Sequence, residues 1–321
     1  MEPVIVAPHP SIKWMPKKFF GAVSSAVLIL CILSHSQPTT VDLQDPGKDF
    51  AFAEFEPYPE FKNKSASNGN QSQYWRIADQ FSFPAGHVSG HFVFGSFKNT
   101  LMDRDIVYNG QKLNDGILQR YWLSGGINLV DAPKHSSFFI AGVGINSDFA
   151  DVGSKDWNTE WIYTHSFKIN PNFQWGLGLD IQQYSGRFIK GPFYPLVFRK
   201  WQLAPYPLLF VNWRLSETTK LVWDADFVEL RKFLGPKLAV TAGVRFNLEF
   251  FALKDNASYE YQSAGAETGI QYSLGKHCYL RLKYKELLWG RENLGLPNGG
   301  PLHEEDIGSG RSLRLNLAYG I

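Results

Sequence analysis

The chain ends on SLRLNLAYGI, residues 312–321, and this stretch decides the fold. Apolar and polar or small residues alternate strictly in it, which places the two sets on opposite faces of an extended strand. Chain termini usually fray. A regular amphipathic strand at the very end therefore indicates that other strands hold it, as they hold the last strand of a closed barrel. The apolar face consists of Leu313, Leu315, Leu317, Tyr319 and Ile321.

The same alternation recurs upstream in segments of about ten residues, the length that crosses a membrane as a tilted strand. In residues 238–250 every second residue is apolar, while Arg245 and Glu249 fall on the other face. A helical period would place both charges within the apolar stripe, so the pattern favours a strand. Further alternating segments lie at 157–169, 173–182, 209–215 and 278–288.

The connections between these segments alternate between short and long, as they do between the two rims of a membrane barrel. From about residue 87 this parity predicts about 12 strands if residues 220–233 form two short strands, and 10 if they do not. Residues 74–83 are a further candidate strand. We therefore expect an all-β, antiparallel, up-and-down transmembrane β-barrel. The short turns lie at 170–172, 216–219, 234–237 and 274–277, and the long loops at 99–116, 147–156, 186–204 and 291–310.

The N-terminus has the pattern of a targeting segment. Lys17 and Lys18 precede an apolar run at residues 19–33, and the small-x-small sequence of residues 34–36 follows. This order predicts a signal peptide over residues 1–36, cleaved before Gln37. Met15 stands just before the basic pair, and we expect it to be the true start. The alternative is an uncleaved N-terminal anchor.

Residues 37–73 differ from the rest of the chain, because they are polar and show little periodicity. The run NKSASNGNQS at 63–72 is typical of loop or disorder. We expect this segment to be either a periplasmic extension or an inward plug, and we expect the barrel itself to span residues 74–321.

The bulk composition excludes some classes of protein. The 321 residues carry a formal net charge of +2, with basic and acidic residues in balance, which argues against a nucleic-acid-binding protein. Aromatic residues make up 15% of the chain, as suits the aromatic girdles of a membrane barrel. A soluble all-β protein with an aromatic core is the alternative.

No enzyme signature is present: HExxH, GxSxG, phosphate-loop and paired-cysteine motifs are all absent from the sequence. We therefore expect no enzyme, no metal and no cofactor. His87, Ser89 and His91 form a polar cluster at alternate positions, which places them on one face if they lie on a strand. They are expected to be lumen-facing side chains near one rim, with a catalytic role as the alternative.

Charged residues opposite the apolar faces are the main candidates for function, because charges are costly against lipid and tolerated in a lumen. Two interpretations stay open. The charges line a narrow pore that favours anions, since basic residues outnumber acidic ones, or they pair into a network that closes the interior. These candidate lumen-lining residues are Arg214, Arg245, Glu249, Glu267, Arg281, Lys283 and Lys285.

With this N-terminus, terminal strand, loop asymmetry and aromatic content, the chain resembles bacterial outer-membrane β-barrel proteins, and most nearly uncharacterised families known as domains of unknown function. The resemblance implies a place in outer-membrane lipid and assembly through the C-terminal strand by the barrel-assembly machinery. That strand ends on Ile321, where such signals usually end on Phe or Trp.

The resemblance implies no activity. Our expectation is a narrow channel or transporter for small solutes, with a bias to anions. The alternatives are a closed structural or interaction barrel and a lipid-modifying enzyme built on His87, Ser89 and His91.

Overall fold

In the computed structural model the described residues are 49–63, 71–89, 91–103, 106–108, 111–112, 114, 117–149, 152–153, 156–184, 203–253, 257–275, 278–295 and 303–320. The expected signal peptide, residues 1–36, lies outside them, as does Ile321. No helix in this part of the chain is both long and apolar enough for a membrane crossing.

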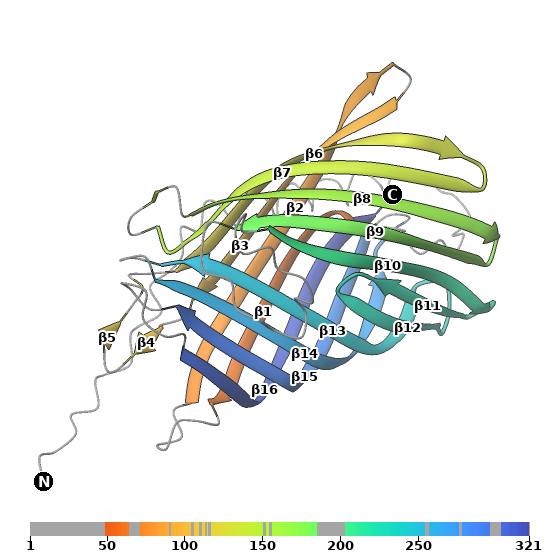
Figure 1. The fold of residues 1–321 in the computed structure, drawn as a ribbon. Helices are drawn as coiled ribbons and strands as arrows, with labels where there is room; N and C mark the ends of the chain where they lie inside the picture. Colours follow the sequence, from red (N-terminus) through yellow and green to blue (C-terminus); the bar gives the residue numbers. More distant parts are fainter. Residues whose placement is uncertain are drawn as a thin grey trace, which may run out of the picture.

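The described strands close into a barrel of 14 antiparallel strands, in the order β1-β16-β15-β14-β13-β12-β11-β10-β9-β8-β7-β6-β3-β2 (Figure 1). A separate small hairpin, β4 (Val107–Tyr108) with β5 (Gln111–Lys112), lies in the loop after β3. The wall strands are β1 (Asp49–Asn63), β2 (Gln71–Val88), β3 (His91–Asp103), β6 (Leu118–Ala132), β7 (His135–Ser147), β8 (Trp157–Asn170), β9 (Phe173–Tyr184), β10 (Leu203–Ser216), β11 (Thr219–Asp224), β12 (Phe227–Phe233), β13 (Leu238–Ala252), β14 (Ser258–Ser273), β15 (Cys278–Gly295) and β16 (His303–Gly320).

The C-terminal strand closes the barrel, as its alternation predicts. β16 pairs with β15 on one side and with β1 on the other, where Phe55 lies opposite Leu315. The stretch 220–233 folds as two short strands, β11 and β12, which is the condition for the higher of the two predicted counts.

The predicted count of about 12 strands, or 10, is nevertheless wrong, because β1 and β2 add two strands at the N-terminal end. β1 lies inside the 37–73 range, so the periplasmic or plug segment expected there does not extend over residues 49–63. One face of β1 carries Glu54 and Glu56, and Pro57 interrupts its alternation. A charged face and a proline are typical of a loop when the sequence is considered alone. In the structure β1 pairs with β16 and β2, and these partners show that it is a strand.

The wall has its apolar side chains outside and its polar side chains inside. On β16, Leu315 is 46% exposed, while its neighbours Arg314 and Asn316 are 4% and 7% exposed. Leu282 and Tyr284 on β15 and Leu177 on β9 are likewise exposed. A soluble sandwich buries its apolar face, so the structure has the inverted arrangement of a transmembrane β-barrel of the outer-membrane type.

Aromatic side chains gather on the outer wall near the short turns. The Phe167 and Trp175 rings lie 5.1 Å apart, and the Phe173 and Trp213 rings lie 5.6 Å apart. Rings at this level of a barrel form an interfacial girdle, because one end of each ring faces lipid and the other faces headgroups and water.

The wall is uneven on the side of β11 and β12, which have only 6 and 7 residues. The β10–β11 ladder ends at Phe210 opposite Asp224, and the β12–β13 ladder ends at Phe227 opposite Arg245. Beyond Arg245, β13 runs towards β7 on the far side of the barrel. There Ala252 lies opposite Ser147, and the Asp148 amide donates to the Ala252 carbonyl at 3.2 Å.

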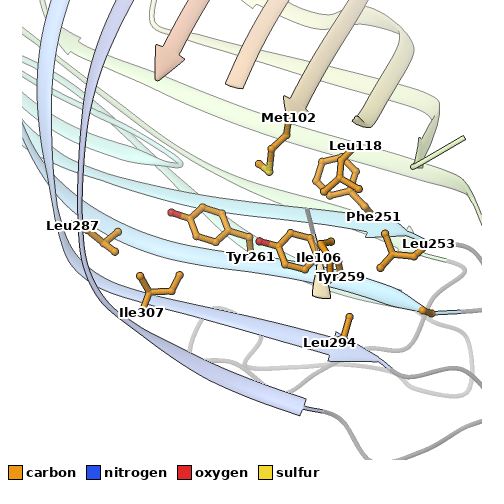
Figure 2. Packing of buried hydrophobic residues seen from close by; sticks show 11 residues of the cluster. Met102, Ile106, Leu118, Phe251, Leu253, Tyr259, Tyr261, Leu287, Leu294 and Ile307 are labelled. Carbon is orange, nitrogen blue, oxygen red and sulfur yellow. The ribbon is translucent and has the colours of Figure 1, made fainter. Parts of the chain in front are cut away.

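Buried apolar side chains fill the interior where these walls meet, at the end of the long loops. Met102 of β3 and Leu118 of β6 face residues of β13 to β16 in this cluster (Figure 2). We call the cluster the apolar seal, because its side chains join opposite walls of the barrel. It comprises Met102, Ile106, Leu118, Phe251, Leu253, Ala257, Tyr259, Tyr261, Leu287, Leu294 and Ile307.

Candidate functional site

Below the apolar seal, the inner wall carries a network of ion pairs that crosses the barrel. Arg76 of β2 donates to Glu54 of neighbouring β1 at 2.8 Å and to Glu249 of β13 at 3.1 Å. Arg120 of β6 lies 3.8 Å from the same Glu249 carboxylate. β13 stands five strands from β2 in the barrel order, so these contacts connect opposite walls.

The network continues along β12 to β16. Glu229 on β12 accepts from Arg231 at 2.5 Å and pairs with Lys283 on β15. Glu267 on β14 pairs with Arg314 and lies 3.7 Å from Lys283. We call the whole set the ion network: Glu54, Arg76, Arg120, Glu229, Arg231, Arg245, Glu249, Glu267, Lys283 and Arg314.

Most of this network is removed from water. The carboxylates Glu229, Glu249 and Glu267 and the cations Lys283 and Arg314 are buried. A charge is tolerated in such a place only when it is paired and hydrogen-bonded, since desolvation costs several kcal/mol per ion. The network thus pairs these buried charges, with six basic groups sharing four carboxylates.

The seven candidate lumen-lining residues fall into two groups in the structure. Arg245, Glu249, Glu267 and Lys283 belong to the ion network. Lys285 is buried on the same face of β15, two residues beyond Lys283.

Arg281 and Arg214 lie apart from that network. Arg281 donates to Gln271 at 2.9 Å and stacks over Tyr279, near the short-turn end. Arg214 is exposed beside the β10–β11 turn. Strand alternation predicts the face on which each residue lies. It does not predict how far along the strand the residue lies, and this position separates Arg281 and Arg214 from the others.

The polar cluster of His87, Ser89 and His91 lies at the short turn between β2 and β3. Ser89 is the turn residue, with φ of 52°, so the three side chains do not share one strand face as their spacing suggested. All three are exposed. His91 Nδ1 bonds to the Asn128 carbonyl at 2.8 Å, and the His87 ring lies edge-on to Phe92.

Several partners in the ion network escaped the sequence reading, among them Glu54, Arg76, Arg120 and Glu229. Each lies on the polar face of a strand, so alternation was the signal that could have found them. Two of these strands, β1 and β2, were not counted in the predicted barrel, and β12 is short.

The inner face of β7 to β10 is of a different kind. Its positions alternate with the exposed apolar residues of the outer wall and include the glycines 142, 144, 176 and 178. Thr164, Ser166, Leu208, Phe210 and Asn212 on this face are each partly exposed, and Gln174 is exposed. The inner wall therefore has a sealed, ion-paired half along β12 to β16 and β1. The half along β7 to β10 is more open towards the short turns, while Asn146, Asn158 and Asp180, nearer the long loops, are buried.

Acidic and amide side chains lie on the part of this open half that is nearer the long loops. Gln182 of β9 donates to Asp180 at 2.6 Å and to Glu160 of β8 at 3.0 Å. Asp156 and Asn158 lie at the start of β8 on the same side, and the Asn158 amide donates to the Asp156 carbonyl. The described residues contain no group of three or more His, Cys, Asp or Glu side chains placed to hold a metal.

The comparisons with known proteins show a likeness in the barrel fold alone. No protein-family model matches the chain, and no curated protein matches it. Among solved structures, the chain resembles the toluene transporter TodX of Pseudomonas putida, with 10% identity, a TM-score of 0.42 and coverage of 92% of this chain and 93% of that one.

Two other solved structures show a similar level of likeness. An active-site mutant of outer-membrane phospholipase A from Escherichia coli has 11% identity, a TM-score of 0.40 and coverage of 94% and 99%. An outer-membrane channel from Pseudomonas putida F1 has 7% identity, a TM-score of 0.40 and coverage of 88% and 100%. These proteins share the closed β-barrel with this chain, and their likeness carries no argument about its activity.

Proposed function

We propose that this chain is an outer-membrane channel for small solutes, with its passage along the inner face of β7 to β10. The observation that carries the proposal is the division of the inner wall. One half is closed by the ion network, whereas the other half has partly exposed polar and small side chains. Small solutes cross a membrane barrel along such a wet, polar inner face.

The contact between β7 and β13 fits this passage. In the strand order it divides the long-loop end into two parts. The apolar seal fills the part bounded by β13 to β16, β1 to β3 and β6. A solute would leave through the other part, beside β8 to β10.

The predicted anion bias is not part of this proposal. It rested on the excess of basic residues among the candidate lumen-lining positions. Arg245 and Lys283 each lie against a carboxylate, Glu267 and Glu229 respectively, so neither is an unpaired cation on the inner wall.

A closed barrel that serves a structural or interaction role is the second candidate. The specific observation in its favour is the apolar seal together with the β7–β13 contact, because both bring opposite walls together. In that case the exposed residues of β7 to β10 line a vestibule that ends below the long loops.

Conductance in planar bilayers separates the two candidates. We expect protein purified from outer membranes to give stable single-channel steps without preference for chloride over potassium. A second variant, Phe251→Ala, removes a buried ring of the apolar seal. If the passage runs beside β8 to β10, this variant should leave the step size nearly unchanged. A silent wild type beside a conducting Phe251→Ala variant would contradict the proposed path and support the closed barrel.

A further inference from the structure

We infer that the acidic cluster on the open half of the inner wall, formed by Glu160, Asp180, Gln182 and Asn158, binds a cation in transit. The inference rests on the proposed function and names its class of solute. The ligand is a small cation held by carboxylate and amide oxygens, either an inorganic ion or the ammonium group of an organic solute.

The geometry brings two carboxylates onto one donor. Glu160 lies opposite Gln182 in the β8–β9 ladder, and Asp180 lies opposite the next inward residue of β8, Ile162. Gln182 uses one amide nitrogen for both carboxylates, at 3.0 Å to Glu160 and 2.6 Å to Asp180. Gln182 bonds both side chains but carries no charge, so this contact is not a salt bridge.

Buried acceptor atoms on this part of the inner wall have no hydrogen-bond partner. Asp180 is 8% exposed and Asn158 is 1% exposed. The Oδ1 atom of each side chain has no hydrogen-bond donor. The Oδ1 atom of Asp156, next to Asn158, also lacks one. Buried acceptors usually have a donor, because leaving one unpaired costs about 1–3 kcal/mol. The unpaired oxygens of Asp180 and Asn158, which lie on the same inner face as Glu160, point to a cation as the missing partner.

The nearest basic groups do not fill this role by direct contact. Lys98 on β3 and Arg120 on β6 are close enough to Asp180 to attract it electrostatically. Arg120, however, lies against Glu249 at 3.8 Å and over the Trp122 ring at 5.3 Å. Lys98 is exposed. Within the described residues, Glu160 and Asp180 thus have no salt bridge, in contrast to the carboxylates of the ion network.

The arrangement suits weak, reversible binding. Two carboxylates with amide oxygens provide hard oxygen ligands for potassium and calcium, and they accept hydrogen bonds from the N–H groups of an ammonium ion. A transit site must bind well enough to attract the ion and weakly enough to release it. Acidic side chains along a pore select cations for the same electrostatic reason.

The first test measures ion selectivity from the reversal potential in a potassium chloride gradient. We expect the wild-type protein to favour potassium over chloride, and the double variant Glu160→Gln, Asp180→Asn to lose this preference. Glu286→Gln is the control, since Glu286 is an exposed carboxylate outside the cluster and 3.9 Å from Arg311. An unchanged preference in the double variant would overturn the inference and leave the channel proposal standing.

The second test measures binding without conduction. Terbium(III) is an oxygen-seeking probe whose emission is sensitised by a nearby indole. Trp122 lies two strands from Asn158 of the cluster, since Gly144 of β7 is opposite Trp122 on one side and Asn158 on the other. We expect sensitised emission from the folded protein in detergent, displaced by calcium, and affinity about tenfold lower in the double variant. Displacement by an alkylammonium salt as well would identify the organic source.

The two tests have distinguishable failures. Terbium binding in a silent barrel would support the cation site and contradict the channel. Conductance with neither cation preference nor terbium binding would support the channel and contradict the cation site. Wild-type binding that the double variant retains would place the probe elsewhere and also contradict the site.

Discussion

Replacing Glu249 with alanine is expected to lower the free energy of unfolding by about 3–5 kcal/mol. Glu249 is buried and accepts from Arg76 at 3.1 Å, with Arg120 at 3.8 Å. The substitution leaves two guanidinium groups with one carboxylate fewer in a region with little access to water. The cost of an unpaired buried charge, rather than the value of the pair itself, makes the expected effect large.

Urea-dependent unfolding of the protein in detergent or lipid measures this effect, with heat-modified mobility on gels as a check of folding. Glu286→Ala is the matched control, because Glu286 forms an ion pair with Arg311 at 3.9 Å in which both side chains are largely exposed. Exposed pairs contribute about 0–1 kcal/mol. Equal losses for the two variants would mean that the interior around Glu249 is open to water.

Replacing Leu282 with arginine is expected to destabilise the inserted barrel by about 2–4 kcal/mol. Leu282 is exposed on β15, and Leu315 lies opposite it on β16. Residues of this face contact the hydrocarbon of the bilayer, where a guanidinium must displace lipid or draw in water. Midway along the span this cost is greatest.

Leu234→Arg is the control for this prediction, since Leu234 is an exposed apolar residue in the turn between β12 and β13. Near an interface the same substitution costs about 0–1 kcal/mol. Unfolding from vesicles, followed by tryptophan fluorescence, compares the two variants. A Leu282→Arg protein as stable as wild type would show that this face of β15 does not contact lipid.

More of the fold than of the function could be predicted from the sequence. The alternation in residues 238–250 and 312–320 predicts the faces of β13 and β16, and the structure bears this out: Leu315 is exposed and Arg314 is buried. A channel was expected from the sequence, but the proposed passage along β7 to β10 and the proposed cation site could not be reached in this way. Gln174, Asp180 and Gln182 read as one polar face. The short turn at 170–172 predicts that residues 157–169 lie beside it, but not that the Gln182 amide bonds both Glu160 and Asp180.

The sequence by itself determined the strand faces and the closure by the last strand, because side chains alternate with a period of two whatever a strand pairs with. Only the tertiary structure decided the count of 14, since the charged face of β1 became recognisable when β16 and β2 lay beside it. The tertiary structure also decided where the side chains of Arg214 and Arg245 lie. Both have the same place in an alternating pattern, yet one lies at a turn and the other against Glu267. Contacts across the barrel, such as Arg76 with Glu249, depend on strand order and on the path of β13, which no local pattern encodes.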